Sequence, residues 1–328
     1  MKRFHNHRID ARTRELHAET RLLPTDFIPA LFVMEPDYQL ERIKGLDGTW
    51  HVGIDRLAEA IQPWLALGMD KVLLFGVPDE LQKSAAGLTA WEGETLVARA
   101  IRRIKTDFPD LTVFTDVCLC AYTDHGHCGL LRPNGQIDND ATLPLLAAMA
   151  LSHARAGADW VAPSAMMDGQ VAAIRKELDN NGFGPERTKV LGYSAKFASA
   201  FYGPFRGAAA SAPEFGDRTT YQMDPRNGRE ALEEIAADLA EGASAVMVKP
   251  ALNYLDVIAR ARDAWPQARL AAYHTSGEFM ALKAAAAAGV VDYRRGLSEQ
   301  LHAIKRAGAD WIIGYAGEDY LAAAKENQ

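Results

Sequence analysis

In Lys305-Arg-Ala-Gly-Ala-Asp-Trp-Ile-Ile313, a helical pattern ends at a glycine and a short apolar run follows after one polar residue. Glycine supplies the left-handed backbone conformation that ends many helices. The apolar run is too short for a helix and is typical of a buried parallel strand. The same pattern returns at 64–75, 154–161 and 239–248. Repeated helix-to-strand units of this kind predict a parallel sheet covered by helices.

Counting outward from these units gives eight candidate strands, at 28–33, 71–77, 111–117, 159–163, 189–193, 245–248, 270–273 and 310–315. Helical patterns lie between them, for example at 54–67, 92–106, 143–156, 169–180 and 229–240. This alternation predicts a (β/α)₈ TIM barrel over residues 26–328, preceded by an N-terminal arm of residues 1–25. An open doubly wound sheet is the alternative. It would carry a glycine fingerprint after its first strand, where Val33-Met-Glu-Pro-Asp37 stands instead.

The composition excludes several classes of partner. The chain has 328 residues, a net charge of −7 and no basic stripe, which argues against nucleic acid. No run of eighteen apolar residues is present, so no membrane span is expected. The first fifteen residues are basic but lack the apolar segment of a secretory signal, and an arm of this kind is expected to pack on a neighbouring subunit. A reducing, cytoplasmic location is expected.

All three cysteines fall in one window, at Cys118, Cys120 and Cys128. Cys118 and Cys120 are two residues apart at the end of a predicted strand, so their side chains point the same way. Cys128 can return to them over a turn. Three converging thiolates predict a zinc site, and three protein ligands leave one position open. The alternative is a chance cluster of buried or free thiols. A disulfide fits the odd count less well.

The barrel prediction places catalytic groups just after the carboxyl ends of the strands. Lys196 follows the fifth strand, Lys249 ends the sixth, and Ser276 and Tyr315 stand at the ends of the last two. Burial at the end of an apolar strand, and a second ammonium nearby, should lower the pKa of Lys249. A neutral amine is what Schiff-base formation with a ketone needs. A lysine that reaches solvent or pairs with a carboxylate is the alternative.

A long Gly-, Ala- and Ser-rich connection between Phe197 and Gln222 is typical of a lid over a barrel rim. Within it, Arg206 and Arg218 can clamp a substrate carboxylate, unless they are solvated surface arginines. Asp116 stands two residues before the first cysteine. It can orient a metal-bound water or move a proton, although a structural role at the strand end is equally consistent with its position.

Eight motifs together resemble the porphobilinogen synthase family, also called 5-aminolevulinate dehydratase, over nearly the whole chain. They are Thr115-Asp-Val-Cys-Leu-Cys120 with His125-Gly-His-Cys-Gly129, Asp138-Asn-Asp-Ala-Thr142, Ala162-Pro-Ser-Ala-Met-Met-Asp-Gly169, Tyr193-Ser-Ala-Lys-Phe-Ala-Ser199, Tyr202-Gly-Pro-Phe-Arg206, Tyr221-Gln-Met-Asp-Pro225, Val246-Met-Val-Lys-Pro250 and Ser276-Gly-Glu278. The resemblance implies that two 5-aminolevulinate molecules condense to porphobilinogen with loss of two waters, in tetrapyrrole (heme) synthesis. It also implies a barrel whose arm wraps a neighbour, usually in a homo-octamer.

The resemblance also implies roles for individual residues. Lys249 would form the Schiff base with the first substrate, whose carboxylate meets Ser276 and Tyr315. Lys196 would hold the second substrate. The remaining implied roles are carboxylate binding by Arg206, Arg218 and Gln222, a pocket lined by Tyr202, Phe205 and Tyr273, catalytic zinc on Cys118, Cys120 and Cys128, and a distant magnesium on Glu234. Gly207, His274 and Gly317 depart from the residues typical of the family, but none of these departures removes a catalytic group.

Two other functions are compatible with parts of the sequence. A single-lysine Schiff-base aldolase on the same barrel uses Lys249 and leaves Lys196 and the cysteines without a role. A catalytically silent relative, kept as a metal-binding or assembly protein, does not explain why both lysines are present. Formation of a pyrrole from 5-aminolevulinate alone distinguishes these readings.

Overall fold

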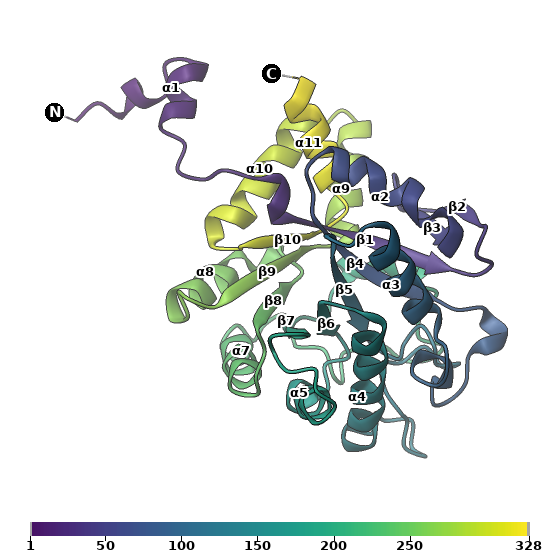
Figure 1. Cartoon of the computed structure of the whole chain (residues 1–328). Coiled ribbons are helices and arrows are strands. Elements are labelled where there is room, and N and C mark those ends of the chain that lie inside the picture. Colours follow the sequence, from purple (N-terminus) through teal and green to yellow (C-terminus); the bar gives the residue numbers. More distant parts are fainter. Residues whose placement is uncertain (1, 327–328) are drawn as a thin grey trace.

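The structure, a computed structural model, describes residues 2–326 and has a closed barrel of eight parallel strands at its centre (Figure 1). The predicted arm (residues 1–25) and the predicted barrel domain (residues 26–328) include residues 1 and 327–328, which lie outside the described part. The barrel strands are β1 (Phe27–Met34), β4 (Lys71–Val77), β5 (Thr112–Val117), β6 (Trp160–Pro163), β7 (Lys189–Lys196), β8 (Ala245–Lys249), β9 (Arg269–His274) and β10 (Trp311–Gly314). Each pairs with the next, and β10 pairs with β1. The predicted (β/α)₈ barrel is therefore confirmed.

Helices surround the barrel on the outside (Figure 1). They are α2 (Leu57–Ala66), α3 (Leu96–Asp107), α4 (Asn139–Ala156), α5 (Gln170–Asn180), α7 (Glu230–Ala240), α8 (Leu255–Ala264), α9 (Ser276–Ala287), α10 (Tyr293–Ala307) and α11 (Gly317–Glu326). Capping sets their first residues: Thr95 accepts a hydrogen bond from the Ala98 amide at 3.1 Å, so α3 begins at Leu96, four residues later than predicted. Gly157, in the left-handed conformation, ends α4.

Two differences from the predicted strands shape the rim. β7 extends three residues beyond its predicted end because its pairing with β8 resumes after a register shift between Gly192 and Ala195. Two short strands, β2 (Leu40–Arg42) and β3 (Trp50–Gly53), were not predicted. β3 pairs in parallel with the second half of β1, whereas β10 pairs with the first half. β3 thus widens the sheet where β1 and β10 separate.

Three aromatic rings close the amino-terminal end of the barrel. Phe114 stacks on Trp160 with centroids 5.1 Å apart, and Trp311 meets Trp160 edge-on at 5.3 Å. These residues come from β5, β6 and β10, which do not all lie side by side, so their contacts cross the barrel interior. The opposite end of the barrel, at the carboxyl ends of the strands, is therefore the one that can receive a small molecule.

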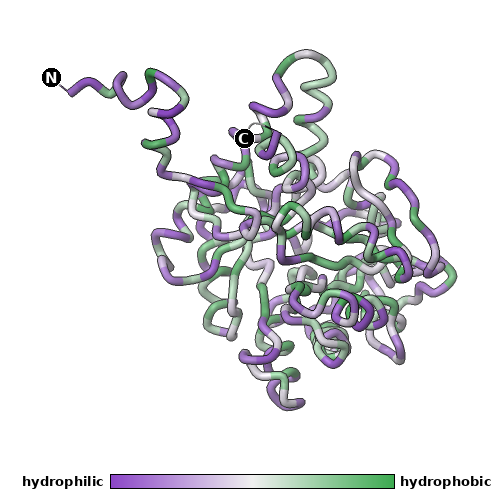
Figure 2. Tube along the Cα trace, turned by 45° about the horizontal axis from the view of Figure 1, so that its top comes forward, coloured by the Kyte–Doolittle hydropathy of each residue, from purple (hydrophilic) through white to green (hydrophobic). Residues whose placement is uncertain are grey.

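The N-terminal arm stands away from the barrel (Figure 1) and is largely hydrophilic (Figure 2). It contains a 3₁₀ turn, Phe4–His7, and the short helix α1 (Ala11–Leu16). Among its apolar side chains, Phe4 is 61% and Leu16 is 73% exposed. Among residues 2–326, no helix has both the length and the apolar character that crossing a membrane needs.

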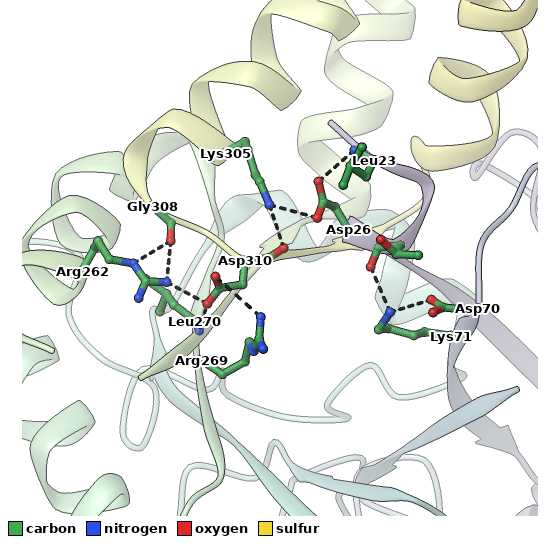
Figure 3. A network of polar contacts seen from close by, with 11 residues as sticks. Leu23, Asp26, Asp70, Lys71, Arg262, Arg269, Leu270, Lys305, Gly308 and Asp310 are labelled. Carbon is green, nitrogen blue, oxygen red and sulfur yellow. Dashed lines mark hydrogen bonds and ion pairs between the residues drawn. The ribbon is translucent and has the colours of Figure 1, made fainter. Parts of the chain in front are cut away.

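A polar network ties the end of the arm to the amino-terminal face of the barrel (Figure 3). Asp26 pairs with Lys305 at 2.9 Å, and Lys305 also donates to the Asp310 carbonyl at 3.1 Å. Lys71 donates to the Thr25 carbonyl at 3.0 Å. The Asp310 carboxylate accepts from Arg262 at 2.7 Å and from the Leu270 amide at 2.8 Å. These contacts connect β4, α8, β9, α10 and the residue before β10 to the root of the arm.

Asp310→Ala should lower the free energy of unfolding by about 1–2 kcal/mol, because it leaves the Arg262 guanidinium and the Leu270 amide without their shared acceptor. Urea unfolding measures the change. Arg294→Ala is the control, since it breaks an ion pair with Glu326 in which both side chains are mostly exposed and should cost less than about 0.5 kcal/mol. Equal losses in the two variants would contradict this account of the network.

Candidate active site

Two lysines stand side by side at the carboxyl ends of neighbouring strands. Lys196 ends β7 and Lys249 ends β8, and the two are register partners across the sheet. They are only 6% and 4% exposed. The Lys196 ammonium donates to the Ser164 carbonyl at 2.5 Å. Lys249 Nζ lies 3.8 Å from the centroid of the Tyr273 ring and 4.9 Å from that of Phe205. Both amines are thus held inside the mouth of the barrel.

The surroundings of Lys249 favour its neutral form. Burial holds the pKa of Lys249 well below its ordinary value, and the nearby charge of Lys196 lowers it further. Asp116 and Cys120 act in the opposite direction and are weaker. The shift has the direction that the sequence predicts. A neutral amine at this position is a nucleophile that can attack a ketone.

The three cysteines meet beyond the end of β5. All are buried, their Sγ atoms lie within 4.8 Å of one another, and those of Cys118 and Cys120 are 3.3 Å apart. Hydrogen bonds from the other two thiols hold the pKa of Cys128 well below its ordinary value, and the charges of Arg218 and Lys196 act in the same direction. Within residues 2–326, this is the one group of three or more His, Cys, Asp or Glu side chains placed to hold a metal ion.

Asp116 lies on β5, two residues before Cys118, and lines the same cavity as Cys118, Cys120 and the two lysines. Burial raises its pKa to about 6, against the opposing effects of the Ser164 hydroxyl and the charges of Lys196 and Lys249. Its Oδ1 atom is buried and has no partner among the described residues. A carboxyl group in this state can accept or give a proton near neutral pH.

Sequence reasoning missed two residues of the site, Tyr193 and Ser164. The Tyr193 ring lies 5.2 Å from Lys249 Nζ and 5.7 Å from Lys196 Nζ, and its buried hydroxyl has no partner among the described residues. Strict alternation along β7 puts residues 193 and 196 on opposite faces, and the register shift between 192 and 195 brings both toward the lysine site. Ser164 belongs to the motif of residues 162–169 that resembles the family, and this motif could have marked it as a site residue.

The predicted lid contains a short helix, α6 (Gly203–Ala208), which carries Phe205 and Arg206. The Phe205 amide donates to Ser276 Oγ at 2.9 Å, so the lid contacts the start of α9. Tyr202 donates through its hydroxyl to the Phe197 carbonyl at 2.7 Å. The Tyr273 and Tyr315 hydroxyls lie 3.4 Å apart. The structure therefore brings these predicted pocket residues together around Lys249.

The predicted carboxylate-binding residues differ in how they are engaged. Arg218 donates to the Gly126 carbonyl at 3.0 Å and to the Ser211 carbonyl, and it lines the lysine cavity. The Nε atoms of both arginines and both polar atoms of the Gln222 amide are buried without partners among the described residues. Such groups are stable in a folded protein when a ligand or water satisfies them.

Glu234 is not among the residues that line the lysine cavity. It lies on α7, where burial, followed by the charges of Asp168 and Asp238, raises its pKa to about 7. Asp168, Glu230 and Glu241 line the same cavity of about 720 Å³. The surrounding acids make this cavity attractive to cations.

Comparison with known proteins links this arrangement to one family. The delta-aminolevulinic acid dehydratase family model matches residues 1–323. Delta-aminolevulinic acid dehydratases from Synechococcus elongatus and Methanothermobacter thermautotrophicus are 46% and 47% identical, over 93% and 98% of this chain and 93% and 96% of theirs. The Toxoplasma gondii enzyme, solved with its product porphobilinogen, superposes with a TM-score of 0.95 at 38% identity, over 100% of this chain and 92% of that one. The chain belongs to the delta-aminolevulinic acid dehydratase family.

Proposed function

We propose that this enzyme condenses two molecules of 5-aminolevulinate to porphobilinogen through lysine Schiff bases, with release of two waters. The observation that carries the proposal is the pair of buried amines of Lys196 and Lys249, held in register on adjacent strands. A condensation of two identical ketones needs two neighbouring anchoring points. The relatives named for this substrate, and the related structure that holds the product, support the same reaction.

Lys249 is the proposed nucleophile toward the first substrate. Its neutral amine attacks the keto carbon, and the resulting carbinolamine loses one water to give the imine. The aromatic rings of Tyr273, Phe205 and Tyr193 exclude water around the nitrogen, which keeps the amine unprotonated. Ser276 and Tyr315 are proposed to hold the carboxylate of this first molecule.

Lys196 is proposed to hold the second substrate, next to the first. The buried donor groups of Arg206, Arg218 and Gln222 that lack protein partners are suited to its carboxylate. Asp116, with its pKa of about 6, is suited to take protons from the joined intermediate and return them to departing oxygen. Bond formation between the two molecules makes one carbon–carbon and one carbon–nitrogen bond.

Metals complete the proposal. Cys118, Cys120 and Cys128 suit zinc, because three thiolate donors converge without a fourth protein ligand. A zinc ion held there would supply a Lewis acid beside the second substrate. Glu234 and its acidic neighbours offer oxygen ligands of the kind that magnesium prefers. Magnesium held there would lie outside the lysine cavity and is proposed to act on conformation.

The same proposal covers assembly and cellular setting. An arm of residues 1–25 outside the barrel of residues 26–328 exposes Phe4 and Leu16, side chains that a second copy of the chain would cover. A homo-octamer with exchanged arms fits these surfaces. The three cysteines are free thiols, which fits a cytoplasmic enzyme of heme synthesis. A single-lysine aldolase, or a silent relative, gives no role to the paired amines.

Removal of the neighbouring charge should change the titration of Lys249. In Lys196→Met, the pKa of Lys249 rises, so the neutral amine and its borohydride-trapped adduct with 5-aminolevulinate appear at higher pH than in the wild type. Trapping is followed by peptide mapping across the pH range. Lys176→Met, an exposed change on α5, should leave the midpoint unchanged. Lys249→Arg should give no adduct at position 249 and no detectable pyrrole. A midpoint that stays constant or falls in Lys196→Met contradicts the proposed coupling.

Zinc content provides an independent test. The purified enzyme should hold about one zinc ion per cysteine cluster. Chelation should abolish pyrrole formation while the urea unfolding midpoint stays nearly constant, because the barrel core does not depend on the metal. The double variant Cys118→Ala, Cys120→Ala should lose zinc by elemental analysis. Return of zinc should restore activity to the chelated wild type and not to the variant. Full turnover in a metal-free sample is the outcome that rules this role out.

A further inference from the structure

The carboxyl end of lid helix α6 is held by groups from outside the lid. The last carbonyls of a helix have no partner within it. Those of Phe205, Arg206 and Gly207 accept from the amides of residues 209–211, between 2.8 and 3.3 Å. The Ala208 carbonyl instead meets His51 Nε2 at 2.5 Å, and the Ala210 carbonyl accepts from Lys83 Nζ at 2.8 Å. Two side chains thus complete the hydrogen bonding of this end.

The two donors come from separate parts of the rim. His51 lies on β3, the short strand beside the end of β1, and its ring meets Phe32 edge-on at 6.2 Å. A carbonyl oxygen only accepts, so the tautomer with the proton on Nε2 is required. Lys83 follows β4, and its side chain is 8% exposed although its partner Glu80 is mostly exposed. Packing therefore holds both donors in place.

The backbone after α6 needs such support. Six residues are too few for a helix that is stable by itself. Ala210 has a φ of +45°, a left-handed conformation that favours glycine and disfavours alanine. The local backbone hydrogen bonds of this turn leave the Ala208 and Ala210 carbonyls to His51 and Lys83. Residues outside the lid therefore contribute to holding the turn.

The contacts matter for function because α6 carries two residues of the candidate active site, Phe205 and Arg206. Phe205 lies against Lys249, and Arg206 is a proposed ligand of the substrate carboxylate. Phe205, Ala209 and Arg218 close the lysine cavity, whose volume is only about 20 Å³ in this closed arrangement. This volume is too small for a keto acid.

We propose that His51 and Lys83 are positioning residues that latch the lid: they hold the carboxyl end of α6 and so set the closed position of Phe205 and Arg206 over the lysines. The latch must release for 5-aminolevulinate to enter and must form again for the substrate to be retained. The inference rests on the proposed function of Arg206. Neither latch residue is among those that line the lysine cavity.

Variants that keep or remove one donor test the latch. His51→Leu removes the donor, and His51→Gln keeps an N–H that can reach the same carbonyl. Lys83→Met and Lys83→Arg form the second matched pair. Lys44→Met, an exposed change on the β2–β3 connection, is the control. Amide hydrogen exchange of residues 205–211 and the KM for 5-aminolevulinate are measured for each variant, together with the urea unfolding midpoint.

In His51→Leu and Lys83→Met, exchange at residues 205–211 should quicken and KM should rise, each roughly five-fold, as expected for one lost hydrogen bond. The unfolding midpoint should stay constant. His51→Gln and Lys83→Arg should restore both values to within about two-fold of the wild type. Unchanged exchange in the donor-free variants overturns the latch, as does equal impairment of the Leu and Gln variants. Exchange is read without turnover, so absence of porphobilinogen from the wild type would refute the reaction and not the latch.

Discussion

The placement of two amines within one apolar barrel mouth is the constraint on which the rest of the site depends. Lys196 and Lys249 face each other across a single pair of strands, and neither is more than 6% exposed. Burial makes a charge on Lys249 costly, and the charge of Lys196 adds to this effect, so the pKa of Lys249 lies well below its ordinary value. In the proposed reaction Lys249 is the nucleophile and Lys196 holds the second substrate, so two identical side chains would have different roles.

The surrounding structure maintains that asymmetry. The aromatic rings of Phe114, Trp160 and Trp311 pack together inside the barrel toward its amino-terminal end, opposite the lysines. Tyr193 and Tyr273 form aromatic walls around Lys249, whereas Lys196 has a carbonyl acceptor and lies near the cysteines. The lid covers the mouth from above. Low polarity on one side and hydrogen-bond acceptors on the other therefore distinguish the two amines.

The barrel and the position of the two lysines at its rim could be predicted from the sequence because each depends on a local pattern. A glycine before an apolar run gives a helix end and a strand, and a lysine after such a run stands at the rim. Tyr193 was missed because a register shift reverses the alternation that places side chains. His51 and α6 were missed for another reason: β3 and the lid helix are too short to have a pattern and form only through contacts with distant segments.

The most direct test of the account asks whether two molecules of the same substrate enter one product. The enzyme is given an equal mixture of unlabelled and uniformly ¹³C-labelled 5-aminolevulinate, and the pyrrole product is analysed by mass spectrometry. The account predicts unlabelled, half-labelled and fully labelled porphobilinogen, with the half-labelled species the most abundant. A product that contains carbon from only one substrate molecule, or no pyrrole from the zinc-loaded enzyme, would contradict it.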